Sequence, residues 1–452
     1  MEKQITIAPG MQSGVERYAA LANVEAESVA WLRALRRESL ARFGEQGFPT
    51  TKNEEWKFTD IRPIADLNAR VATSSTRCSD VDAHIESHFI PDLNGHRLVF
   101  LNGNYAPELS HIGELPAGVT LSNLRAAIDS NDETVQHNLG RTASATQDTP
   151  FIQLNTALLQ DGAFLHVPAG VTVEQPIEIL FHSTSQDEQP TTSSTRNLFV
   201  LGANSRVQII EHYAGEGVYF TNTVTEVVAA QNAHVDHVKL QLESVEAFHV
   251  SSLQVNQERD CKFASHNIDL GGRIVRNNGN AVMGGANIEC TLNGLYVTGG
   301  DQHIDNHTAM DHAQPHCTSF EIYAGIMGGR SRGVFNGKIF VRRDAQKTDA
   351  KQSNRNLLLG GESMISTKPQ LEIFADDVKC THGCTIGQLD EDALFYLRSR
   401  GLPMESARNL LIYAFANDVI NGIEEEPVRT FMEAKLSAKL AHIGVDESAV
   451  AA

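Results

Sequence analysis

The stretch from about residue 150 to 378 is the feature that most constrains how this chain can fold. It contains short runs of Val, Ile, Leu, Phe and Thr, separated by Gly, Asn, Asp and Pro, as in 164–168, 198–201 and 338–341. This pattern is typical of many short β-strands joined by tight corners. Few Asn-Gly hairpin signals join the runs, and no strict repeat of roughly 20–50 residues is visible. The pattern therefore favours an irregular parallel β-helix over a propeller, a sandwich or a barrel.

Both ends of the chain predict helices instead. Residues 26–43 place apolar side chains at helical spacing, and Gly44, Gly47 and Pro49 end that segment. Three more helical patterns follow Asp390, which is suited to cap the first of them. We predict a mainly β protein with three parts. These are an N-terminal, mainly helical region over 1–148, a right-handed parallel β-helix over 149–378 and a C-terminal helical domain over 379–452.

The charge balance narrows the class of partner. The 37 Lys and Arg residues against 56 Asp and Glu residues give a formal net charge of -19. Because binding to nucleic acid or an anionic membrane relies on cationic side chains, neither is expected as a partner. No stretch of about 18 apolar residues suggests a membrane span, and the N-terminus lacks the features of a signal peptide. Six cysteines are too few for a disulfide scaffold, so we expect a cytoplasmic protein with free thiols.

Two features of the sequence before residue 380 bear on its possible chemistry. The chain has no G-x-x-x-x-G-K-[ST] motif, so it is not expected to hydrolyse ATP through a P-loop. His303, Asp305 and His307 would share one face of a strand, and their types suit zinc or iron. A hydrogen-bonded polar ladder between stacked coils is the favoured interpretation, because nothing in the sequence fixes the distances that a metal site needs.

The segment Cys380-Thr-His-Gly-Cys384 is a sharper candidate. In an extended strand Cys380, His382 and Cys384 lie on one face, with neighbouring side chains nearly 7 Å apart at a rise of about 3.3 Å per residue. Bonds of about 2.0–2.3 Å cannot gather three such side chains on one ion without a bend, which Gly383 would permit. The chain has no second cysteine pair at ligand spacing. The motif is therefore either a partial ligand set that another chain completes or simple packing at a strand end.

Several separated segments resemble one known family. They are Ser331-Arg-Gly-Val-Phe-Asn-Gly-Lys338, Asp344-Ala-Gln-Lys-Thr-Asp349, Asn354-Arg-Asn-Leu-Leu-Leu359, Thr367 to Gly387, and Leu394-Phe-Tyr-Leu-Arg-Ser-Arg-Gly401, with Glu54-Glu-Trp-Lys-Phe-Thr59 near the start. In this order they resemble the SufB/SufD family of iron–sulfur cluster assembly proteins over roughly residues 50–425. The chain lacks the cysteine that SufB members carry in the stretch matching 354–356, and its Cys-x-His-Gly form is that of SufD members.

The resemblance implies a scaffold subunit of the SufBCD complex that is not itself an enzyme. It implies a parallel β-helix that pairs with SufB, and C-terminal helices, with Leu394, Leu411, Phe415 and Val419, that dock the ATPase SufC. His382 matches the family histidine at the junction with SufB, where a transient iron–sulfur cluster is shared, and it is the predicted metal ligand. Cys380 matches the family cysteine beside it. Cys384 departs from the small residue usual there, so its role as a ligand is open.

Two other functions are alternatives. A β-helix enzyme that acts on polysaccharide would line a groove with acidic residues such as Asp376 and Asp377. A homodimeric metal-carrying protein would use the sheet edge that otherwise meets SufB, so a homodimer is expected to be possible when SufB is absent.

Overall fold

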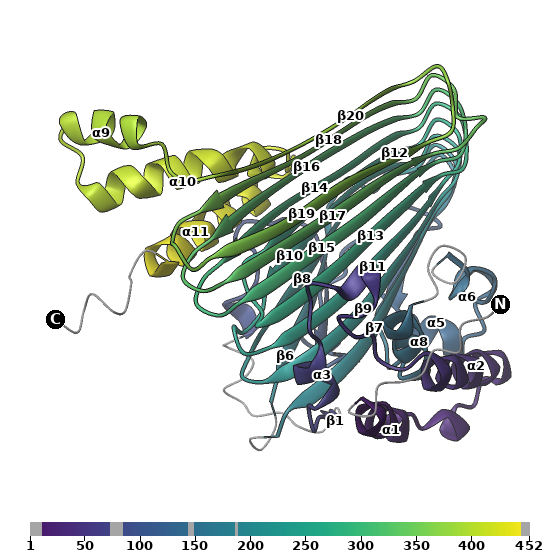
Figure 1. Ribbon diagram of the computed structural model, residues 1–452. Coiled ribbons are helices and arrows are strands. Elements are labelled where there is room, and N and C mark those ends of the chain that lie inside the picture. Colours follow the sequence, from purple (N-terminus) through teal and green to yellow (C-terminus); the bar gives the residue numbers. More distant parts are fainter. Residues whose placement is uncertain (1–10, 73–84, 143–148, 186–188, 444–452) are drawn as a thin grey trace.

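Two long, mostly parallel β-sheets face one another and form a solenoid of about seven turns (Figure 1). The computed structural model describes residues 11–72, 85–142, 149–185 and 189–443. From β5 to β20, successive strands alternate between the two sheets, and each strand pairs in parallel with the strand two positions further along the chain. The chain therefore winds as a coil in which each turn covers the one before it.

The first sheet contains β4 (Thr120–Asn123), β5 (Ala163–Val167), β7 (Thr191–Leu201), β9 (Tyr219–Ala229), β11 (Phe248–Gln257), β13 (Ile274–Met283), β15 (His303–His312), β17 (Arg332–Val341) and β19 (Met364–Ile373), and β1 (Arg70–Val71) pairs with β7. The second contains β3 (Asn104–Tyr105), β2 (His96–Leu101), β6 (Ile177–Thr184), β8 (Arg206–Glu216), β10 (His234–Leu242), β12 (Lys262–Asp269), β14 (Glu289–Thr298), β16 (Thr318–Met327), β18 (Asp349–Leu358) and β20 (Lys379–Gly387).

One corner of the solenoid repeats a left-handed backbone conformation. The residues with positive φ at this corner are Asn204, Asn232, Asp260, Asn287, His316 and Lys347, which are 28, 28, 27, 29 and 31 positions apart. Asn and Asp tolerate this conformation better than most residues. The Asn232 side chain also donates to the Asn204 side-chain oxygen at 2.8 Å. No strict repeat is visible in the sequence because the coil length varies and only the backbone conformation recurs.

The space between the two sheets is apolar in one part and polar in another. The apolar part includes Phe181, Val235, Phe263 and Ile339. The polar part contains buried titratable side chains such as Glu243 and His249, whose Oε2 and Nδ1 atoms lie 2.7 Å apart. Buried charges are tolerated only where partners compensate for the loss of hydration, so neighbouring coils must supply those partners.

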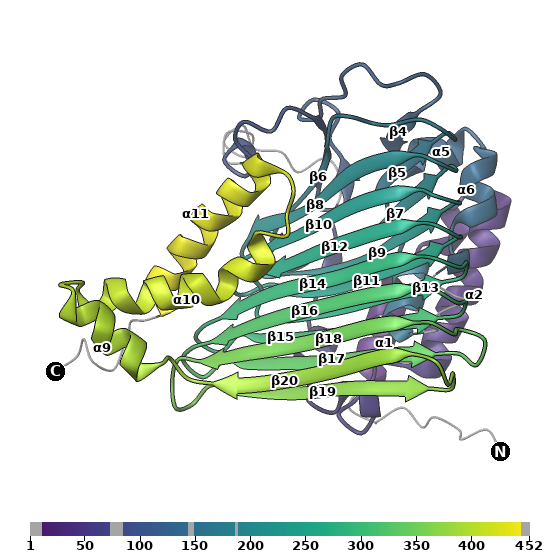
Figure 2. The same ribbon diagram turned by 90° about the horizontal axis from the view of Figure 1, so that it is seen from above.

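Helices cover the outer faces of both sheets (Figures 1 and 2). The helical segments before the solenoid are α1 (Gln12–Leu21), the 3-10 turns Val24–Ala26 and Glu54–Trp56, α2 (Ala30–Gln46), α3 (Arg62–Ala65), α5 (Leu124–Asp129), α6 (Glu133–Asn138) and α8 (Pro150–Ala157), and those after it are α9 (Glu391–Ser399), α10 (Met404–Ile420) and α11 (Glu426–Ile443). Helix α8 packs on β7 and β9, whereas α10 packs on β14 and β16. None of the described helices is long and apolar enough to cross a lipid bilayer.

The predicted β-helix core with helical flanks is confirmed. The strands extend beyond the predicted limits of the core, however. Before residue 149, β2 pairs with β6 and β4 pairs with β5. After residue 378, β20 adds one more parallel strand, and α9 begins only at Glu391. A strand edge offers unpaired backbone groups, and these added strands satisfy them.

The corner at Asn232 provides a test of this fold. We expect Asn232→Ala to lower the free energy of unfolding by about 1–2 kcal/mol, because a Cβ without a local polar group disfavours the left-handed conformation. Urea unfolding measures the change. Asn232→Gly is the control, since glycine adopts positive φ without strain, and an alanine variant as stable as the glycine variant would contradict this explanation.

Candidate functional site

The inner face of the last coil carries the Cys-x-His-Gly-Cys motif. Strand β20 pairs with β18 so that Cys380 lies beside Ala350, His382 beside Gln352 and Cys384 beside Asn354. Ala350, Gln352 and Asn354 are buried inside the solenoid. Paired residues in a parallel sheet direct their side chains to the same face. The three motif residues therefore face the solenoid interior.

This coil is the end of the solenoid, so its inner face is open. Strand β20 is the last strand of its sheet and β19 is the last strand of the other (Figure 2). As a result His382 and Cys384 are exposed and Cys380 is half-buried. Burial and the nearby Asp349 raise the pKa of the Cys380 thiol, which keeps it protonated at neutral pH.

The motif lies in an extended strand, and it contains no bend that gathers its three side chains. Among the described residues, no group of three His, Cys, Asp or Glu side chains is placed to hold a metal ion. Donors at alternate positions of one strand lie about 6.6 Å apart along it. By themselves, these three side chains therefore cannot close a metal site.

A polar column lies beneath His382 that the sequence analysis did not single out. The Gln352 side chain donates from Nε2 to Glu321 Oε2 at 2.6 Å, and Thr308 Oγ1 donates to the other Glu321 oxygen. Burial raises the pKa of Glu321 to about 7, against the lowering effect of these two hydrogen bonds. Gln352 lies 30 residues before His382 and Glu321 lies 31 residues before Gln352. These separations equal the length of one coil, which is the signal that could have found them.

The histidines near residue 303 hold the N-terminal segment. Thr59 Oγ1 lies 2.8 Å from His303 Nε2 and also donates to Asp305. His307 lies between two carboxylates, with Nδ1 3.1 Å from Glu55 Oε2 and Nε2 3.0 Å from Asp305 Oδ1. The favoured interpretation as a polar ladder was incomplete, because their partners include a segment almost 250 residues earlier in the chain. These contacts hold the 54–59 segment over β15.

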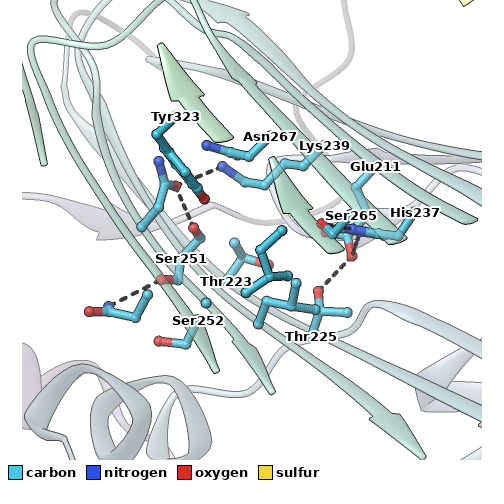
Figure 3. Close-up of a pocket in the computed structure, with 15 residues that line it drawn as sticks. Glu211, Thr223, Thr225, His237, Lys239, Ser251, Ser252, Ser265, Asn267 and Tyr323 are labelled. Carbon is cyan, nitrogen blue, oxygen red and sulfur yellow. Dashed lines mark hydrogen bonds and ion pairs between the residues drawn. The ribbon is translucent and has the colours of Figure 1, made fainter. Parts of the chain in front are cut away.

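A small chamber inside the solenoid is the other polar cluster (Figure 3). Thr225 donates to Glu211 at 2.7 Å, His237 Nδ1 lies 2.8 Å from Ser265 Oγ, and Lys239 donates to Asn277 Oδ1 at 2.9 Å. Its volume of about 40 Å³ holds a few water molecules. Small-molecule pockets are usually about 300 Å³ or larger. The chamber is therefore part of the packing of the core.

The C-terminal helices place the four predicted docking residues differently from one another. Val419 is 1% exposed and packs against the second sheet, so it is not available on the surface. Leu411 and Leu394 are half-buried, and Phe415 packs partly on the same core while Arg355 lies over its ring. The apolar side chains that are most exposed on α9 and α10 are Phe395, Tyr396, Met404 and Leu410. Sequence periodicity identified an apolar stripe on α10 but not which part of it the solenoid covers.

The remaining cysteines do not join the motif. Cys261, Cys290 and Cys317 are buried free thiols in the solenoid core, and burial raises the pKa of Cys290 to about 12. Cys78 lies outside the described residues. Free thiols match the prediction for the five cysteines that the structure describes.

Comparison with known proteins decides the family. The model of the SufBD core domain of SUF system iron–sulfur cluster assembly matches residues 181–415, and that of the SufBD N-terminal region matches residues 16–179. The chain belongs to the SufB/SufD family. This confirms the resemblance found from the sequence motifs. It also places the chain in iron–sulfur cluster assembly, the process for which the family is named.

Individual SufB/SufD relatives agree over most of the chain. An iron–sulfur cluster assembly SufBD family protein of Synechocystis is 33% identical over 390 residues, which cover 84% of this chain and 85% of the relative. The SufD protein of Escherichia coli is 30% identical and covers 87% of this chain and 90% of its own length. A chloroplastic protein of Arabidopsis thaliana is 29% identical over 88% of this chain and 84% of its own.

The buried Glu321 provides a pH test of this site. Its pKa is raised from 4.5 in the unfolded chain to about 7 in the folded protein, so folding favours the protonated carboxyl. The stability of the wild type should therefore fall as the pH rises from about 5 to about 8, by up to roughly 3 kcal/mol relative to Glu321→Gln. Urea unfolding of both proteins across this range measures the difference, and parallel stability profiles would contradict the raised pKa.

Proposed function

We propose that this chain is a non-catalytic scaffold subunit that pairs with SufB, docks the ATPase SufC and helps to form a nascent iron–sulfur cluster. The observation that carries the proposal is the inward-facing Cys380, His382 and Cys384 set at the open end of the solenoid. Family membership supports the assembly role. Family membership also favours this role over that of a polysaccharide-active enzyme. In an assembly role the iron and sulfide are substrates, so this chain need not retain them by itself.

Pairing with SufB would occur through the end of the solenoid. Strands β19 and β20 end their sheets, and their outer backbone groups are suited to pair with strands of another chain. Two solenoids joined in this way would enclose the His382 side chain between them. The same edge would allow a homodimer when SufB is absent.

His382 is the side chain best suited to act as a ligand in such a junction. It is exposed and it lies on the inner face of the last coil, between Cys380 and Cys384. A neutral imidazole binds iron through one ring nitrogen. Donors from SufB would complete the set, because the side chains of β20 cannot converge on one ion.

We expect His382→Ala to leave the complex with SufB and SufC intact and to lower the rate of cluster formation. The variant removes one donor but no buried side chain, so assembly should not change. Anaerobic reconstitution of the co-expressed complex, followed by visible absorption, measures the rate. His137→Ala, which removes an exposed histidine on α6, is the control. Cluster formation at the wild-type rate in the His382 variant would contradict the proposed ligand role.

Docking of SufC would use the projecting helices α9 and α10. Helix α9 has no buried residue, and it lies away from the solenoid (Figure 1). Phe395 is 73% exposed, and Tyr396 on the same helix and Met404 at the start of the next helix are also exposed. Large apolar side chains exposed on neighbouring helices are typical of a protein contact site.

We expect Phe395→Asp to weaken binding of SufC by at least about 10-fold. The loss of a central aromatic side chain at an interface typically costs about 2 kcal/mol or more of binding free energy. Titration of the purified chain with SufC by calorimetry measures the affinity. Phe58→Asp is the matched control, since Phe58 is also an exposed aromatic residue but lies in the 54–59 segment, outside the C-terminal helices. Equal affinity of the two variants for SufC would place the dock elsewhere.

A further inference from the structure

We propose that Gln352 is a positioning residue for His382. Its side-chain oxygen would accept a hydrogen bond from one N–H of the imidazole and leave the other ring nitrogen free to bind iron. This inference rests on the proposed role of His382 and adds a residue that the sequence motif does not contain.

The register of the last two coils places the two residues together. Gln352 on β18 is the paired neighbour of His382 on β20, and equivalent residues of adjacent strands lie about 4.8 Å apart. Gln352 is 4% exposed, and its Oε1 atom is buried without a hydrogen-bond partner among the described residues. A buried acceptor that stays unpaired costs about 1–3 kcal/mol. A donor from the coil above would remove that cost.

The Gln352 amide is held in the orientation that this contact requires. Its nitrogen donates to Glu321, which lies one coil further inside and also accepts from Thr308. Because Glu321 Oε2 accepts the hydrogen bond from the amide nitrogen, the amide oxygen is left on the other branch of the amide. The opposite wall leaves room for this side chain, since a Cβ at Gly337 would lie 2.3 Å from Gln352 Nε2.

The consequence for His382 is a defined ring orientation and tautomer. An imidazole that ligates a metal usually donates its other N–H to an oxygen acceptor, and loss of that acceptor typically costs 10–100-fold in metal affinity or activity. His382 lies on an exposed strand at the open end of the solenoid, where few neighbours restrict its ring. The amide oxygen of Gln352 is the buried acceptor from the adjacent coil that can do so.

The first test is cluster formation by the complex with SufB and SufC. We expect Gln352→Leu, which keeps the bulk but removes the acceptor, to slow cluster formation roughly 10-fold. Gln352→Glu should restore much of the rate, because it keeps an oxygen at the same position. Gln257→Leu is the matched control, since Gln257 is another buried glutamine and lies on β11, four strands away from β19.

The second test measures the reactivity of the His382 imidazole in the free chain. The rate of carbethoxylation of His382 by diethyl pyrocarbonate, followed by peptide mass spectrometry, reports how reactive its free nitrogen is. We expect a several-fold slower reaction in Gln352→Leu and a near wild-type rate in Gln352→Glu and Gln257→Leu. Urea unfolding shows that each variant is folded, and Gln352→Met replaces the leucine variant if that protein is unstable.

Unchanged carbethoxylation of His382 in a folded Gln352→Leu chain would overturn the inference. Unchanged cluster formation in that variant would also overturn it, provided that His382→Ala is impaired. If His382→Ala forms clusters at the wild-type rate, the proposed function fails. The carbethoxylation rate then decides alone whether Gln352 holds the ring.

Discussion

The parallel ladder between successive coils is the constraint on which the rest of the structure depends. Each strand obtains its backbone hydrogen bonds from the equivalent strands of the coils on either side, so every inner side chain stacks on its equivalent. The strands at the end of such a ladder have a neighbouring strand on one side only. The last coil must present both an unpaired edge and an inner face that nothing covers. The candidate site lies there because His382 and its two cysteine neighbours are core positions of a coil that lacks a successor.

The helical regions add cover without closing this end. The N-terminal helices and α8 bury apolar side chains such as Phe220 and Phe248 on the outer face of the first sheet. Helices α10 and α11 do the same for Val238 and Ile326 on the second sheet. Helix α9 buries none of its residues against the chain. The molecule therefore presents two different surfaces, a backbone edge with polar side chains and a helix pair with exposed apolar side chains, which suit two different kinds of partner.

Much of this architecture could be predicted from local patterns. Short β-runs, helix caps such as Asp390 and the alternation that puts Cys380 and His382 on one face are all set within a few residues. The burial of Val419 and the contact of Thr59 with His303 could not be predicted, because each depends on segments far apart in the chain. Gln352 and Glu321 precede His382 by one and two coils, and this spacing was missed because the coil length varies along the solenoid.

The sequence by itself determined the fold class, the family and the residue types that could bind iron. These follow from local periodicity and from motifs whose order along the chain is enough. Only the tertiary structure decided which of those residues are accessible and what supports them. Exposure of His382 depends on its coil being the last, and the buried amide beneath it depends on the register between β18 and β20. Register and exposure arise from contacts between coils, which no single segment of the sequence contains.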